Sequence, residues 1–119
     1  YGYLDKKMKN TLQAISNHKY SNILDNIGNS DITHNINFHL FKEIVLKYEG
    51  LKNSITTQRN FLINLGIKQR AEILSKNVSF LKKADIFYRL ERLISEKQMG
   101  HLFKVMFIQN KKRKFNLGF

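Results

Sequence analysis

The chain has 119 residues, a formal net charge of +12 at neutral pH and a hydrophobic content of 42%, which is ordinary globular usage and predicts a core. It contains no cysteine, so disulfides and thiolate metal sites are excluded. No apolar run approaches the roughly 18 residues that a membrane-spanning helix needs, and the charged first residues do not form a signal-peptide pattern, so we expect neither feature.

The first four residues, YGYL, read as the end of a strand that runs into a loop. Tyr1 and Tyr3 flank a glycine there, and open α/β sheets place ligands at such strand ends. A ligand-lining role for the two tyrosines stands beside a simpler one, an aromatic pair that covers an exposed strand end. Residues 10–20 alternate weakly and favour an extended segment over a helix, and His18 within them reads as a surface or loop histidine.

Residues 26–30 predict a turn, and residues 31–38 alternate as a strand does. Asp31 is a candidate catalytic carboxylate at the start of this strand. His34 is three residues further on, so the two side chains would point to opposite faces and direct pairing is not expected.

Asn37 stands before apolar residues that recur at helical spacing. It therefore predicts the N-cap of a helix over residues 38–49, with Gly50 just past the helix end.

Residues 51–57 predict a short strand or an extended lead-in, after which Thr57 caps the next helix. Gln58 and Arg59 begin that helix, where free N–H groups and the helix dipole favour an anion. The alternative is that both side chains face solvent, and the residues alone favour this alternative.

Gly66 ends the short helix and permits a left-handed turn into a second one. Ser79 predicts the cap of a third helix, whose apolar residues keep a spacing of three and four through Ile94. Its other face carries four basic residues that could contact phosphates, although a solvated helix face is the commoner explanation; they are Lys82, Lys83, Arg89 and Arg92.

A glycine turn at Met99 and Gly100 leads into residues 101–109, HLFKVMFIQ. This segment is apolar on both faces apart from Lys104, which predicts a strand buried in the middle of a sheet. Neither this strand nor the apolar helix after Thr57 can bury its apolar face alone, so we expect them to pack on each other or on a part outside the chain. Residues 110–119 read as a basic tail, KKRK, that ends in an apolar anchor.

The positive charge has two explanations, nucleic-acid binding and a gene rich in A and T, whose codons favour Lys, Asn and Ile. The scattered lysines favour the second explanation, so nucleic acid is not the expected partner. The start at Tyr1 rather than Met indicates a trimmed chain or a gene fragment. No Walker loop, GxGxxG, zinc pattern or nucleophile elbow appears, so no complete active site and no metal site are expected.

The ordered segments YGY, NTLQAISNHKY, GxxDITxxIxF, TTQxxFLxxLGIxxRAxxL, MGxLFKV and a terminal GF closely resemble the C-terminal half of MidA-like S-adenosylmethionine-dependent methyltransferases. The resemblance covers essentially the whole chain. It implies an α/β fold, the C-terminal portion of a class I (Rossmann-like, doubly wound) methyltransferase domain. Residues 1–119 would be a single partial domain with residues 110–119 as its basic tail, and the strand HLFKVMF would be the last, antiparallel one of the sheet.

The resemblance also implies an activity, the methylation of a protein arginine on a subunit of respiratory complex I. Its donor loop and acidic motifs would lie upstream of Tyr1, so we expect no cofactor-binding residue in this chain and no activity from the chain alone. Substrate-side residues implied by the resemblance and by position are Tyr1, Tyr3, Thr57 and Gln58, with Asp31 as the catalytic candidate. The family usually has aspartate where Asn37 stands, so this chain keeps the capping ability at that position but lacks the charge.

Two kinds of partner follow from these expectations, a separate N-terminal half or a second copy of the chain. The alternative reading is a small basic module that binds nucleic acid or protein without catalysis. For a bacterial gene we expect a cytoplasmic protein, and for a eukaryotic gene a protein of the mitochondrial matrix.

Overall fold

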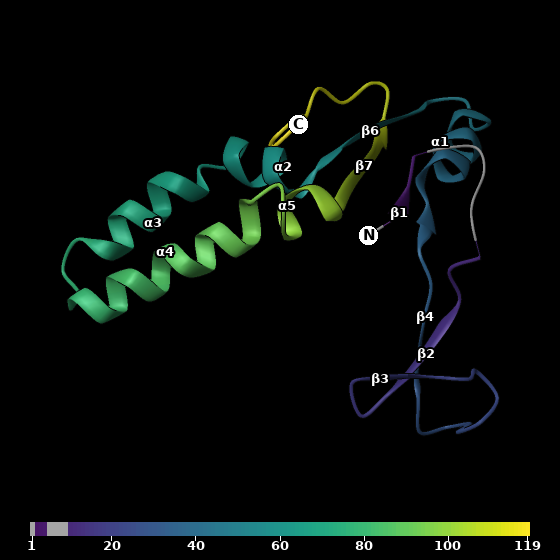
Figure 1. Cartoon of the computed structure of the whole chain (residues 1–119). Helices are drawn as coiled ribbons and strands as arrows, with labels where there is room; N and C mark the ends of the chain where they lie inside the picture. The colour runs from purple at the N-terminus through teal and green to yellow at the C-terminus, as the bar shows by residue number, and fades with distance from the viewer. Residues whose placement is uncertain (1, 5–9) are drawn as a thin grey trace. The chain divides into compact units, whose positions relative to one another are not determined.

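The structure, a computed structural model, describes residues 2–4 and 10–119, except for the side chain of Tyr3. Its contacts divide the chain into two compact units, Tyr1–Lys42 and Glu43–Phe119. Strands dominate the first unit and helices the second (Figure 1). The predicted α/β class is therefore confirmed, whereas the prediction of one partial domain with a separate tail stays a prediction.

The first unit contains a small antiparallel sheet in which strand β2 (Gln13–Ser16) lies between β3 (Lys19–Ser21) and β4 (Asp31–Thr33). Asn17 and His18 connect β2 to β3 and have φ angles of 50° and 60°. Two successive left-handed residues are typical of a type I′ turn, whose twist matches that of the flanking strands. The extended conformation predicted for residues 10–20 is confirmed in β2 and in the first part of β3, but the turn divides the segment in two, and His18 is an exposed turn residue.

The strand predicted over residues 31–38 is divided in two. Strand β4 pairs with β2, whereas β5 (Ile36–Asn37) pairs in parallel with β1 (Gly2–Tyr3). Between them, the Asn35 N–H donates to Thr11 Oγ1 at 3.0 Å. Apolar alternation carries no information about a change of pairing partner, so the prediction of one continuous strand is wrong.

Helix α1 (Phe38–Leu46) follows β5 directly, and the division between the two units falls within it. Asn37 Oδ1 accepts a hydrogen bond from the Leu40 N–H at 3.0 Å, so it satisfies one of the donors that a helix start leaves free. The N-cap prediction for Asn37 is thus confirmed, although the helix ends before the expected Glu49.

The second unit is organised around a two-stranded antiparallel sheet of β6 (Leu51–Thr57) and β7 (Lys104–Asn110). All seven residues of each strand are paired, from Leu51 opposite Asn110 to Thr57 opposite Lys104. The strand predicted for residues 51–57 is confirmed. The stretch after Thr57 and the last strand do pack on each other, as one of the two alternatives expected.

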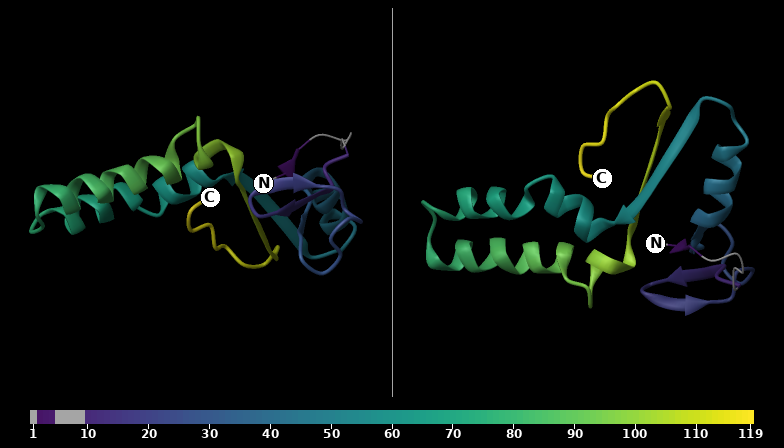
Figure 2. Two further views of the ribbon diagram at one scale, coloured as in Figure 1. Left: turned by 60° about the horizontal axis from the view of Figure 1, so that its bottom comes forward. Right: turned by 90° about the horizontal axis from the view of Figure 1, so that it is seen from above.

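Three helices follow β6: α2 (Gln58–Asn64), α3 (Ile67–Ser75) and α4 (Phe80–Ile94). Gly66 joins α2 to α3 with a φ angle of 81°, a left-handed conformation that is strained for other residues. Ser79 Oγ accepts from the Lys82 N–H at 3.5 Å, as its predicted cap role requires. Helices α3 and α4 lie side by side as an antiparallel hairpin (Figures 1 and 2).

The glycine turn predicted before the last strand is wrong, because residues 99–102 form a short helix, α5 (Met99–Leu102). Gly100 is buried in it, and a Cβ at this position would lie against the Ile94 carbonyl and 2.7 Å from Ser95 O. Glycine is therefore used here for close backbone packing rather than for a turn. Among the described residues β7 pairs with β6 alone and is half-buried, so the expectation of a buried central strand is also not met within this chain.

Few side chains of the described chain are buried. The apolar ones are Ala14, Phe38, Val45, Ala71 and Ile94. Large apolar side chains remain exposed on both units, more than single scattered surface residues would explain. The fold thus offers apolar surface to further polypeptide or to another partner.

Candidate functional site

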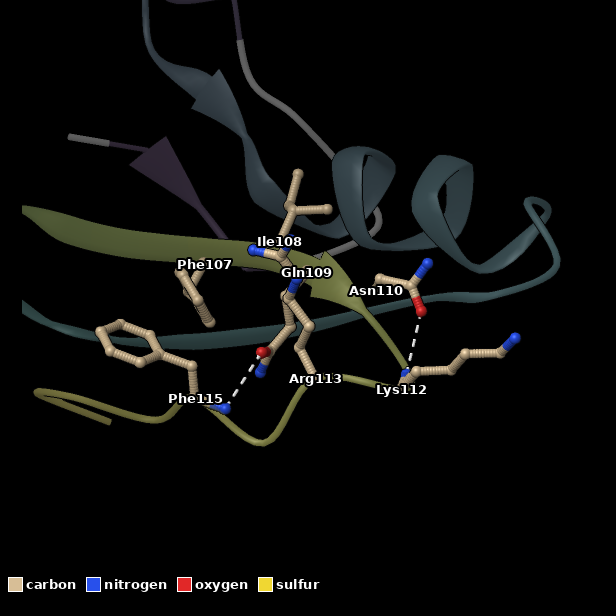
Figure 3. A pocket seen from close by; sticks show the side chains of 7 residues that line it. All are labelled: Phe107, Ile108, Gln109, Asn110, Lys112, Arg113 and Phe115. Atoms are coloured by element: carbon tan, nitrogen blue, oxygen red, sulfur yellow. Dashed lines mark hydrogen bonds between the residues drawn. The ribbon is translucent and has the colours of Figure 1, made fainter.

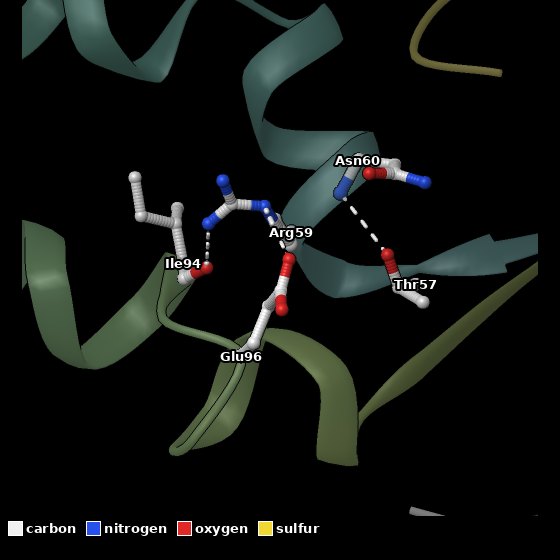
Figure 4. A network of polar contacts seen from close by, with 5 residues as sticks. All are labelled: Thr57, Arg59, Asn60, Ile94 and Glu96. Carbon is white, nitrogen blue, oxygen red and sulfur yellow. Dashed lines mark hydrogen bonds and ion pairs between the residues drawn. The ribbon is translucent and has the colours of Figure 1, made fainter.

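The junction of β6 and α2 holds three polar residues that the sequence singles out, Thr57, Gln58 and Arg59, and the last two contact the end of α4. Thr57 closes the strand and caps the helix, because its Oγ1 accepts from the Asn60 N–H at 3.2 Å (Figure 4). Its backbone conformation is extended, with φ −77° and ψ 154°, which is the usual geometry of an N-cap residue. The predicted cap is confirmed.

Gln58 makes two contacts across this junction. Its backbone N–H donates to Phe103 O at 3.0 Å and so ties α2 to the start of β7. Its side-chain Nε2 donates to Leu93 O at 2.9 Å. The last carbonyls of a helix lack partners within the helix. The Gln58 side-chain amide donates to one of these carbonyls at the end of α4.

Arg59 supplies a second donor to the same helix end. Its Nη1 donates to Ile94 O at 2.7 Å (Figure 4). Its Nε lies 3.8 Å from Glu96 Oε1, a carboxylate whose side chain is 72% exposed, so this ion pair contributes little. A cation at a helix C-terminus also interacts favourably with the helix dipole.

The expectation that Gln58 and Arg59 face solvent is therefore wrong, and the guanidinium of Arg59 contacts the carbonyl of Ile94 and the carboxylate of Glu96. We call Thr57, Gln58 and Arg59 the junction clasp, because they join β6, α2 and the end of α4. The sequence contains no signal for this arrangement, since the partners are main-chain carbonyls 35 residues away. A substrate role for Thr57 and Gln58 stays a prediction.

The remaining candidates lie in the first unit. Asp31 is exposed at the start of β4, opposite Ile15 of β2, so its carboxylate is open to a ligand. Tyr3 is in β1, opposite Asn37, and Tyr1 lies outside the described residues. The catalytic role of Asp31 and the substrate roles of the tyrosines stay predictions.

A cavity of about 730 Å³ lies between β7 and the chain that follows it (Figure 3). The Phe115 N–H donates to Gln109 Oε1 at 3.4 Å, and the Lys112 N–H donates to Asn110 Oδ1 at 2.9 Å, so side chains of β7 hold the returning segment. The lining is apolar and basic: Phe107, Ile108, Gln109, Asn110, Lys112, Arg113 and Phe115. Sequence reasoning missed this cavity because it treated the tail as solvated.

The last residues pack against the second unit through aromatic rings. The Phe119 ring centroid is 5.5 Å from that of Phe61 and 5.5 Å from that of Phe107, within the range of favourable aromatic pairs. Asn64 Nδ2 also donates to Gly118 O at 3.3 Å. The chain end thus acts as the apolar anchor that its sequence indicates, although Leu117 itself is exposed.

Within the described ranges, residues 2–4 and 10–119, no group of His, Cys, Asp or Glu could hold a metal ion. None of the helices in those same ranges is long and apolar enough to cross a membrane.

Comparison with known proteins finds similar methyltransferases. A sequence model described as a putative S-adenosyl-L-methionine-dependent methyltransferase matches residues 1–57. The chain is 28% identical over 105 residues to the mitochondrial protein arginine methyltransferase NDUFAF7 of Xenopus tropicalis, covering 87% of this chain and 24% of that protein. It is 26% identical over 113 residues to the Danio rerio protein of the same name, covering 95% and 26%.

Solved structures agree with these sequence matches. An uncharacterized protein from Burkholderia thailandensis superposes with a TM-score of 0.71 at 28% identity, covering 91% of this chain and 29% of that one. A methyl transferase candidate from the same organism, bound to S-adenosyl-homocysteine, superposes with a TM-score of 0.69 at 28% identity, covering 91% and 28%.

The chain thus spans about a quarter of the length of the curated relatives that it matches. Its strands and helices superpose on solved structures of the group along nearly its whole length, in agreement with a partial Rossmann-like methyltransferase domain. The chain is a relative of the MidA-like S-adenosyl-L-methionine-dependent methyltransferases.

Proposed function

We propose that this chain is the C-terminal part of a protein-arginine methyltransferase and contributes its substrate side rather than its methyl donor site. The observation that carries the proposal is the superposition of 91% of the chain on a structure that binds S-adenosyl-homocysteine. The curated relatives add the acceptor, since their name is protein arginine methyltransferase. The family resemblance adds respiratory complex I as the protein that carries the arginine.

The residues present do not fit S-adenosylmethionine. Class I methyl donor and dinucleotide sites use a glycine-rich loop between a strand and a helix and an acidic residue that holds the ribose hydroxyls. The sequence has no such glycine pattern. Among the described residues, the lining of the cavity beside β7 has no carboxylate and carries Lys112 and Arg113 instead, which suit neither the ribose nor a sulfonium cation.

What the chain offers instead is a carboxylate for the acceptor. An arginine side chain presents planar N–H donors that a carboxylate accepts in pairs, and the exposed Asp31 on β4 is open to such contact. A carboxylate that fixes the guanidinium would align its nitrogen with the incoming methyl group, and alignment is a large share of the rate in such reactions. Tyr1, Tyr3, Thr57 and Gln58 remain proposed substrate-side residues.

The two-stranded sheet of β6 and β7 can be extended by further strands. Strands β6 and β7 pair only with each other within the described part of the chain, so each keeps a free edge that another strand can extend. A separate N-terminal half, or a second copy of the chain, would satisfy these edges. The location would follow the gene, cytoplasm in a bacterium or mitochondrial matrix in a eukaryote, and the matrix agrees with the mitochondrial names of the vertebrate relatives.

Fragment complementation tests the proposal. The Burkholderia thailandensis relative would be expressed without the region that matches this chain, and the 119-residue chain would be added in trans. We expect the mixture, and neither part alone, to transfer methyl groups to arginine peptides. Asp31→Asn should abolish transfer while the mixture still binds S-adenosyl-homocysteine, because Asp31 is exposed and is proposed to contact the acceptor arginine, not the methyl donor.

An active mixture in which Asp31→Asn has no effect would remove the role of Asp31 but keep the family function. A mixture that associates, binds the donor product and transfers nothing to arginine would overturn the arginine assignment.

The second reading is a basic nucleic-acid-binding module that would use the basic face of residues 82–92 and the tail KKRK, and the net charge of +12 favours it. Binding through phosphates weakens steeply with salt because counterions are released. Titration of an oligonucleotide at two salt concentrations distinguishes the readings, since we expect only weak, sequence-independent binding that is lost at the higher concentration.

A further inference from the structure

In the part of the chain that the structure describes, the N-terminal half of α4 has a second apolar face that is exposed. Only Ile86, Leu90, Leu93 and Ile94 of this helix are shielded. Phe80 is 83% exposed, Leu81 79% and Tyr88 64%. At 100° per residue these three side chains lie within about a third of the helix circumference, so they form one stripe rather than scattered contacts.

The connection between α3 and α4 adds to this surface. Ile73 and Leu74 at the end of α3 are 66% and 50% exposed. The loop lies at the end of the hairpin that is remote from α2 and α5 (Figures 1 and 2). We call Ile73, Leu74, Phe80 and Leu81 the hairpin tip.

Basic side chains surround the hairpin tip. Lys76, Lys82 and Lys83 are exposed around it, beside one exposed acid, Glu72. A second nearby acid, Asp85, is paired with Arg89, with Oδ2 and Nε 2.8 Å apart. Among the described residues the tip therefore presents a net positive charge beside its apolar groups. A partner must match both properties, so it must be anionic at its surface and apolar just beneath.

We propose that the hairpin tip is a docking surface for an anionic lipid membrane. Helices with Lys and Arg beside Phe and Leu bind in the headgroup region of bilayers, and each basic residue near an anionic surface strengthens the attachment. The contact is peripheral and needs no concave site on a partner, which suits the end of a helical hairpin.

Two other occupants fit the same residues less well. A second copy that met this one tip to tip would place the same exposed lysines, Lys76, Lys82 and Lys83, against each other, and like charge opposes association at this surface. Single-stranded nucleic acid stacks its bases on aromatic rings, but three of the four tip residues are aliphatic and offer no stacking surface.

The first unit supplies a matched control. Tyr20 and Ile27 are 79% and 78% exposed, as much as Leu81 and nearly as much as Phe80. Residues 17–30 around them contain one basic and one acidic residue, Lys19 and Asp25, so this second apolar surface is electrically neutral.

Sedimentation with vesicles tests the proposal on the whole 119-residue chain, using phosphatidylcholine vesicles with or without phosphatidylglycerol. Binding is expected only when phosphatidylglycerol is present. Phe80→Ser with Leu81→Ser should weaken it at least about tenfold, from the apolar area removed. Lys82→Gln with Lys83→Gln should weaken it by about tenfold or more at low salt, and Tyr20→Ser with Ile27→Ser should leave it unchanged.

A fluorescence reporter makes the test independent of these losses. The chain has no tryptophan, so Phe80→Trp and Tyr20→Trp each introduce a single one. The Phe80→Trp emission should shift to shorter wavelength with anionic vesicles, and that of Tyr20→Trp should not. Four results would each overturn the proposal. They are no binding at all, equal binding to neutral vesicles, an equal shift of both reporters, and a Phe80→Trp response to an oligonucleotide but not to vesicles.

Discussion

The two ends of helix α4 differ in almost every respect. Its C-terminal end is closed, since Gln58 and Arg59 donate to the carbonyls of Leu93 and Ile94 at 2.9 and 2.7 Å. At its N-terminal end Phe80 is 83% exposed. One end of the helix is thus held by the rest of the unit, and the other end presents a surface. The exposure of its apolar residues is therefore confined to one end of the helix and does not indicate general disorder.

The largest effect is expected where the closed end meets α5. Gly100→Ala would place a methyl group against backbone atoms of Ile94 and Ser95, which cannot move without displacing the end of α4. We expect a loss of about 3 kcal/mol in the free energy of unfolding. Urea unfolding followed by circular dichroism measures it, and a loss below about 1 kcal/mol would contradict the tight packing described here.

The clasp itself gives the next effect. Arg59→Met keeps most of the side-chain volume but leaves Ile94 O without its donor, which should cost about 2 kcal/mol because the acceptor lies at a buried residue. Glu96→Gln is the control. Its ion pair with Arg59 is exposed, so a change of less than about 0.5 kcal/mol is expected, and equal losses in the two variants would mean that the ion pair, not the carbonyl contact, holds the junction.

The two helix caps compare the closed and open regions directly. Thr57→Ala removes a hydrogen bond of 3.2 Å at the junction, and Ser79→Ala one of 3.5 Å at the open end. We expect about 1 kcal/mol for Thr57→Ala, and a smaller loss for Ser79→Ala because the bond is longer and the helix start there is exposed. Hydrogen exchange of the Asn60 and Lys82 amides would report each cap separately, and the reverse order would contradict the contrast.

The smallest effect on stability is expected at the hairpin tip. Phe80→Ser removes a side chain that is 83% exposed, so the free energy of unfolding should change by less than about 0.5 kcal/mol. Thermal unfolding of the variant beside the unchanged chain is sufficient to measure this. A marked loss would mean that Phe80 is packed in solution, and the tip would then not be available to a membrane.

Much of the local structure was predictable because it depends on neighbouring residues. Caps at Asn37, Thr57 and Ser79 and the turn at Gly66 follow from residue types at helix boundaries. The clasp, by contrast, joins side chains of α2 to main-chain carbonyls of α4, and main-chain acceptors are present at every position of every sequence. No residue pattern could therefore indicate it.

The incorrect predictions from the sequence likewise concern contacts between residues that are far apart in the chain. The strand over residues 31–38 alternates as one element, but its two parts pair with different strands. HLFKVMFIQ is apolar enough for a central strand, yet its first two residues belong to α5, because Gly100 lets that turn pack against the end of α4. Strand pairing partners and close backbone contacts depend on tertiary structure, which the apolar pattern of one segment does not specify.

The central claim is that this chain carries part of a methyltransferase fold without its donor site. Isothermal titration of S-adenosylmethionine into the purified 119-residue chain, with light scattering to define its oligomeric state, tests it most directly. We predict no saturable heat from the chain alone. Saturable micromolar binding would contradict the claim, since it would require a donor site built from residues that have neither the glycine loop nor the ribose-binding carboxylate.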